Sequence, residues 1–267
     1  MFKLLKREFS RNRTAFIVYC VIAVLSAWLY IVLFPSIQKQ SAQLNEIMKG
    51  FPPAMMEAFG IDKTGFNSIE KFLSTELMSF IWPILVILFA VSRAGASIAG
   101  SIENRVLGLE ISMPISRTKL FMSKLIGEYL AMILFCLVSV LSIIPLCALH
   151  DIDLHISRIF LLTVLAILFG VTLVSFAFAI SALVSEKGHV YFTVGGLLFV
   201  SYVINIVSSV SDNFSGLKYV SIFHYFAPFE ILSGKTIPAI SILVFLMLSV
   251  ISAIVGSFVF RNRDIPV

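Results

Sequence analysis

The sequence predicts an all-α membrane protein with six transmembrane helices, an N-terminal amphipathic elbow helix and a helical first outer loop. Of the 267 residues, 59% are hydrophobic and only 13% are charged, so the chain has too little polar surface to remain soluble. Six apolar stretches are long enough to cross a hydrocarbon core about 30 Å thick, which needs about 20 helical residues. Because polar or turn-forming residues separate these stretches, we expect one membrane domain over residues 1–267.

The six expected spans differ little in length, and the first of them contains no charged residue. They cover residues 15–34, 77–99, 125–149, 159–184, 190–210 and 237–260. An even number of spans places both termini on the same side of the membrane.

The residues before the first span combine apolar and basic side chains. Phe2, Leu5 and Phe9 share one helical face and basic residues supply the other, which is typical of a helix that lies in the headgroup plane. We therefore expect an elbow helix that leads into the first span. An ordinary charged flank, which only sets orientation, is the alternative interpretation.

The connection between the first two spans is about 40 residues, over 35–74, and is longer than a simple connection needs. Apolar residues recur in it at helical spacing. Asn67 and Glu70 resemble a capping box, which predicts a helix that runs directly into the second span. The loop is interpreted either as a lid over the span ends or as a cap that contacts substrate.

The basic residues border the spans and are concentrated on one side of them. This distribution favours both termini in the cytoplasm by the positive-inside rule, and it does not form the basic, aromatic-interleaved surface expected of a nucleic-acid-binding protein. On the side predicted to be cytoplasmic lie 12 of the 20 basic residues: Lys3, Lys6, Arg7, Arg11, Arg13, Arg105, Arg117, Lys119, Lys124, Lys187, Arg261 and Arg263.

Ionisable residues within the spans are rare. Arg93 lies inside the second span and Glu128 just inside the third, each one or two turns from the cytoplasmic end. Because a charge in hydrocarbon is costly, these two side chains are a candidate ion pair. Snorkelling of Arg93 to the headgroups is the alternative.

The sequence lacks the residue patterns of several kinds of catalytic, metal-binding and nucleotide-binding site. All four histidines lie in loops, and no His-Glu-x-x-His zinc motif occurs, so we expect neither a catalytic site nor a metal site. The sequence contains no Gly-x-x-x-x-Gly-Lys-Ser/Thr phosphate loop, so we expect no bound cofactor and no ATP hydrolysis by this chain. Cys20, Cys136 and Cys147 all fall within spans, and we expect them to be buried and structural.

The segment from Ser101 to Lys124, between the second and third spans, is the most informative on the cytoplasmic side. Pro114 interrupts one helix and Ser116 is a candidate cap for the next. Arg117 and Lys124 are candidate anchors of the third span. A structured loop of this kind is suited to contact a soluble partner.

This segment resembles the membrane subunits of ABC-2 type exporters, in which a glutamate and a glycine precede a Pro-Ile/Val-Ser-Arg turn and a lysine. Leu109 and Glu110 depart from the family pattern. The residues that match it are Glu103, Gly108, Pro114, Ile115, Ser116, Arg117 and Lys124.

The resemblance implies a permease of a bacterial plasma-membrane exporter. It implies that a second permease copy or homologue forms a dimer with this chain, and that a separate cytoplasmic ATPase binds ATP and Mg and contacts residues 103–124 as a coupling element. Apolar spans suit a drug, peptide or lipid substrate, and membrane lipid surrounds them. The alternative is a non-transporting scaffold or sensor whose loop binds another soluble partner.

Overall fold

The computed structural model describes residues 13–39, 68–111, 115–210 and 212–263. Within these ranges the chain contains helices but no strand, and six helical segments are long and apolar enough to cross a membrane. The predicted all-α, six-span fold is confirmed. The expected elbow helix and most of the expected helical outer loop fall in residues 1–12 and 40–67, which lie outside the described residues.

The first three spanning segments are longer than predicted, and two of them are interrupted. The first is α2 (Arg13–Lys39); the second comprises α5 (Ile69–Phe72), the π-helix η1 (Leu73–Ile81), α6 (Trp82–Ser97) and α7 (Ala99–Glu103); the third comprises α9 (Arg117–Leu141) and α10 (Ile143–Leu149). The second segment begins as predicted with a helix that continues into the span. Its cap is Ser68, whose hydroxyl accepts a hydrogen bond from the Lys71 N–H over 3.4 Å.

The remaining three spans are single helices, with shorter helices between them. The spans are α11 (Ile156–Leu183), α12 (Lys187–Val210) and α14 (Ala239–Asn262); the shorter elements are α8 (Val106–Ile111), the 3₁₀ helices η2 (Asp212–Val220) and η3 (Ile222–Tyr225), and α13 (Pro228–Leu232).

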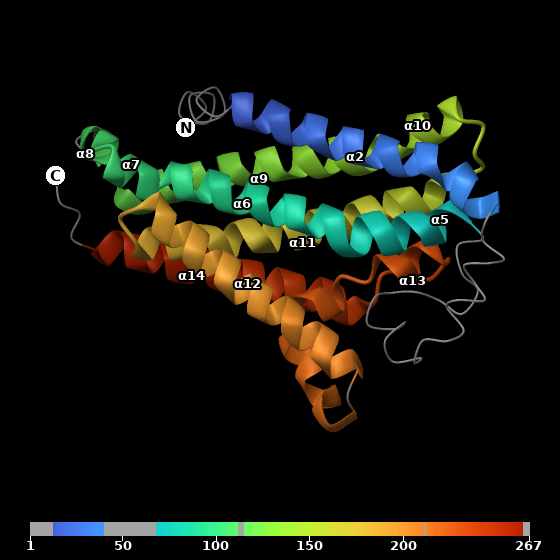
Figure 1. The fold of residues 1–267 in the computed structure, drawn as a ribbon. Helices are drawn as coiled ribbons and strands as arrows, with labels where there is room; N and C mark the ends of the chain where they lie inside the picture. The colour runs from blue at the N-terminus through green and yellow to red at the C-terminus, as the bar shows by residue number, and fades with distance from the viewer. Residues whose placement is uncertain (1–12, 40–67, 112–114, 211, 264–267) are drawn as a thin grey trace.

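The helices alternate in direction, so their ends gather at two ends of the bundle (Figure 1). We call one the Arg117 end; it carries α7, α8, the starts of α9 and α12, and the end of α14. The opposite end carries α5, α10 and α13. Figure 1 also shows that α12 leans away from the bundle toward η2.

Helix α11 forms the centre of the bundle. We compare an 18-residue apolar stretch from each span. In α11, 61% of these residues are buried inside the bundle, whereas in α12 and in α14 only 17% are. Helices α6, α9 and α14 pack around it. A side chain at Gly256 of α14 would lie 2.8 Å from the Phe121 ring and 3.0 Å from the Ala179 backbone, so this glycine permits the close approach of α14 to α9 and α11.

Aromatic side chains attach the segment after α12 to the bundle near the opposite end. The Trp82 and Phe226 rings stack with centroids 5.4 Å apart, and those of Phe169 and Phe226 with centroids 4.5 Å apart. The Trp82 indole N–H donates to the Ser139 hydroxyl over 3.0 Å, so its polar atom is satisfied within the bundle. This cluster holds the second span, α9, α11 and the segment after α12 in contact with one another.

Candidate functional site at the Arg117 end

The second span is interrupted at Ile98, one turn before its end. Ile98 has φ −109° and ψ −67°, outside ideal helical geometry. The Ser181 hydroxyl of α11 accepts a hydrogen bond from the Ala99 N–H over 3.1 Å and donates one to the Ala94 carbonyl over 2.7 Å. A side chain from a neighbouring helix therefore satisfies backbone groups at the break, as a membrane interior requires.

Lys124 of α9 reaches the same break. Its ammonium group donates to the Ser97 carbonyl over 2.8 Å and to the Ser101 hydroxyl over 3.4 Å. It also forms an ion pair with Glu110 of α8, with 2.7 Å between the charged atoms, and both side chains are buried. A buried pair of this kind contributes little net stability but fixes geometry, so Lys124 holds α8 and the broken span against α9.

Glu103 links the end of the second span to α12. Its carboxylate accepts a hydrogen bond from the Lys187 N–H, at the first residue of α12, over 3.1 Å. The N–H groups of a first helical turn lack intrahelical partners and carry a partial positive charge, which a carboxylate satisfies. The second and fifth spans are joined at this point.

Ser116 and Arg117 start α9 and connect it to the end of α14. The Ser116 hydroxyl accepts a hydrogen bond from the Lys119 N–H over 3.3 Å, as an N-cap does. Arg117 Nη1 donates to the carbonyl of Arg263, just after α14, over 2.6 Å. The first turn of the third span is thereby attached to the end of the sixth.

Arg263 continues this connection to the end of α11. Its guanidinium donates to the carbonyls of Ala182 and Val184 over 2.8 and 2.9 Å, and to the Ser185 hydroxyl over 2.5 Å. Arginine at a helix C-terminus satisfies unpaired carbonyls and complements the helix dipole. Burial lowers the pKa of Arg263 from its ordinary value, but a guanidinium remains charged in proteins.

Helix α8 packs against the bundle and exposes the large apolar side chain of Leu109. Leu107 and Glu110 are buried against the bundle, whereas Leu109 is 73% exposed. Gly108 lies half-buried in the same helix, and Ile115 lies half-buried just before the α9 cap. Pro114 lies outside the described residues.

The structure places Glu103, Ser116, Arg117 and Lys124, four of the seven residues predicted from the resemblance, in neighbouring polar contacts at the Arg117 end, which we call the polar network. The structure also adds members that the sequence did not identify. Glu110, a departure from the family pattern, is the ion-pair partner of Lys124. Ser181 and Arg263 act across 82 to 87 and 78 to 81 residues of sequence, and no local pattern connects them to the site.

The two intramembrane charges also come together. Arg93 Nε donates to Glu128 Oε2 in a short ion pair, and the two side chains are 2% and 1% exposed. The Arg93 guanidinium lies 5.7 Å from the Phe89 ring centre, which adds a cation–π contact. Arg93 is therefore directed into the bundle and not toward the headgroups.

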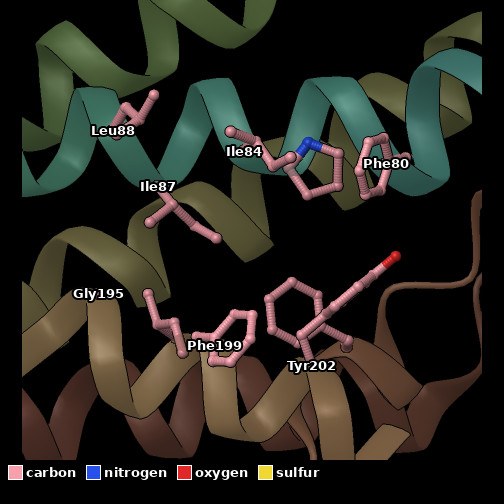
Figure 2. A pocket seen from close by; sticks show the side chains of 10 residues that line it. Phe80, Ile84, Ile87, Leu88, Gly195, Phe199 and Tyr202 are labelled. Atoms are coloured by element: carbon pink, nitrogen blue, oxygen red, sulfur yellow. The ribbon is translucent and has the colours of Figure 1, made fainter. Parts of the chain in front are cut away.

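A separate apolar pocket of about 290 Å³ lies between the second span and α12 (Figure 2). Phe80, Ile84 and Ile87 face Phe199 and Tyr202 across it. Tyr202 is the one lining residue with a polar side-chain atom. The lining residues are Phe80, Pro83, Ile84, Ile87, Leu88, Gly195, Leu198, Phe199, Tyr202 and Phe223.

Six spans, an apolar pocket between two of them and a polar network at one end describe a multi-pass membrane protein. A family model described as ABC-2 family transporter protein matches residues 3–265. The chain therefore belongs to the ABC-2 transporter family and is a permease subunit of an ABC transporter. No curated protein matches the chain in the sequence comparison.

Proposed function

We propose that this permease subunit works in an exporter, in which a separate ATPase subunit supplies the energy to move a hydrophobic or amphipathic substrate out of the cell. The observation that carries the proposal is the polar network at the Arg117 end. Through Glu103, Lys124 and Glu110 it connects one small surface helix to three spans. The sequence has no phosphate loop of its own, so ATP and Mg bind to the partner.

The Arg117 end lies in the cytoplasm of a bacterial cell in this proposal, with both termini on that side. The concentration of basic residues there supports this orientation. The ATPase docks on α8, where Leu109 offers a large exposed apolar side chain on a helix that its buried neighbours hold in place.

Coupling follows from the contacts of α8. A displacement of this helix acts on α9 through the Glu110–Lys124 pair, and on α12 through Glu103 at the end of α7. Helix α12 has few buried residues and forms one wall of the apolar pocket. Movement of α12 against the second span therefore changes the pocket, as a rigid-body rearrangement driven by nucleotide in the partner.

The pocket supports the substrate class. Its side chains are apolar apart from one tyrosine hydroxyl, so they select for apolar surface and offer no charge to bind an ion. Phe199 lines the pocket and is still 68% exposed, so the wall is incomplete on that side. A second permease copy, paired along α12, closes it in this proposal.

The test is co-purification of the tagged protein from its native host in mild detergent, with an ATP hydrolysis assay. Leu109→Glu is expected to abolish retention of the ATPase, because it places a charge in an apolar contact without touching the buried network. Leu149→Glu is the matched control, since Leu149 is 76% exposed at the opposite end.

Equal retention in the two variants would contradict docking on α8. If no ATPase accompanies the unaltered protein, the exporter proposal fails and a non-transporting scaffold or sensor becomes the better interpretation.

A further inference from the structure

A second groove lies between α9 and α14, with α11 as its floor. Its volume is about 640 Å³, within the usual range of ligand sites of roughly 300–1,000 Å³. Ser249, Ala253 and Ser257 line it at intervals of four residues along α14. These small side chains leave a furrow along the helix.

The polarity of the groove changes along its length. Its mouth, at the Arg117 end, is formed by Thr118 and Arg261, which are both exposed, and exposed Lys119 lies beside it. No acidic residue lines the groove, and among the described residues neither of these two basic side chains takes part in an ion pair. Among the described residues, the mouth therefore presents positive charge and a hydroxyl with no acidic side chain beside them.

The deeper part of the groove is largely apolar, and the hydroxyls of Ser249 and Tyr129 are satisfied within the bundle. The Ser249 hydroxyl donates to the Phe245 carbonyl over 2.7 Å and bonds the Thr172 hydroxyl over 3.0 Å. The Tyr129 hydroxyl bonds that of Ser175 over 2.7 Å. Apart from Ser257, apolar side chains form the remaining wall.

The length of the groove corresponds to one leaflet. It extends from Thr118 to Tyr129 on α9 and from Arg261 to Leu246 on α14, which is about 17 and 22 Å at a rise of about 1.5 Å per residue. One leaflet contributes about 15 Å of hydrocarbon. A charged mouth above an apolar furrow of this depth matches a phospholipid headgroup and one acyl chain.

We infer that this groove binds an anionic phospholipid, whose phosphate lies at Arg261 and Thr118 and whose acyl chain follows the furrow on α14. Basic sites between spans at a membrane surface favour anionic headgroups. A second copy related by two-fold symmetry would place the same basic rim against itself, which disfavours a protein occupant. The inference needs only that the Arg117 end meets a membrane surface, and it holds whether or not an ATPase docks there.

The test uses the full-length protein in nanodiscs of equal amounts of phosphatidylglycerol and phosphatidylcholine, with native mass spectrometry of the lipids retained after extraction. The unaltered protein is expected to retain phosphatidylglycerol preferentially. Arg261→Gln is expected to lower that preference about fivefold, equivalent to about 1 kcal/mol for one basic residue at a membrane surface. Ala253→Trp fills the furrow and is expected to remove the retained lipid.

Val255→Trp is the matched control, because Val255 is exposed on α14 outside the groove, and it is expected to retain lipid. Equal retention of the two lipids by the unaltered protein would overturn the inference, and so would retention unchanged by Ala253→Trp. A disulfide-linked dimer formed by Ser257→Cys in membranes would also overturn it, since a second copy would then occupy the groove. The described native cysteines are buried and do not compete in that reaction.

Discussion

Lys124 illustrates why a buried charge is retained in the spans of this protein. Its side chain is 4% exposed. The ammonium group pairs with the Glu110 carboxylate and donates hydrogen bonds to the Ser97 carbonyl and the Ser101 hydroxyl. Desolvation offsets most of the attraction within such a pair. Its contribution is the geometry that it imposes on α8 and on the interrupted second span.

Removal of only one partner of this pair leaves the other charge buried. Lys124→Met is expected to destabilise the protein by about 3–5 kcal/mol, and Glu110→Leu by a similar amount, measured as loss of folded protein on heating in detergent. The double variant is expected to be more stable than either single variant, because neither charge then remains unpaired. Additive losses in the double variant would show that the two side chains act independently.

Arg93 and Glu128 provide a second residue-scale prediction. Arg93→Glu and Glu128→Arg each place two like charges next to each other at buried positions. Each substitution is expected to reduce the amount of folded protein in the membrane strongly. The double exchange restores opposite charges, and we expect it to recover a substantial part of the loss, measured by fluorescence-detected size-exclusion chromatography. Failure of the double exchange to recover would mean that the pair does not stabilise the bundle.

Among the elements, α6 and α12 determine the shape of the apolar pocket. Two adjacent glycines of α12 allow a matched comparison, because a side chain at Gly195 or Gly196 meets no atom within 4 Å. Gly195 lines the pocket and Gly196 does not. Gly195→Trp is therefore expected to fill the pocket and to reduce export severely, whereas Gly196→Trp retains it.

The measurement for this pair is accumulation of an uncharged hydrophobic fluorescent dye in cells that express the transporter with its ATPase. ATP hydrolysis without substrate is expected to persist in both variants, since the polar network is untouched. Equal export by the two variants would exclude the pocket from the substrate path.

At the same scale, the sequence predicted the spans well and their interruptions poorly. Apolar length alone locates a span, because the bilayer sets its thickness. The break at Ile98 depends on Ser181, which lies 82 residues away from Ala99, and such a pairing exists only after the helices pack. For the same reason, Glu103 and Lys124 were predicted through the family pattern, while the partners that give them a role were not.

For the whole molecule, the distribution of basic residues predicts an orientation that one experiment can test. All three described cysteines are buried, so a new surface cysteine is the main target of a membrane-impermeant maleimide. Asp153 and Lys119 are exposed at opposite ends of the bundle. Asp153→Cys is expected to react in intact cells, and Lys119→Cys only after the membrane is permeabilised, because the proposed orientation places the Arg117 end in the cytoplasm.

The reverse labelling pattern would contradict the proposed ATPase docking and the proposed coupling. Helix α8, with exposed Leu109, would then face outward, where a cytoplasmic ATPase cannot reach it. The network of Glu103, Lys124 and Glu110 would still connect the spans, but it could not transmit nucleotide-driven movement. The lipid groove would move to the outer leaflet without losing its charge or its length, so the labelling result separates the coupling proposal from the lipid site.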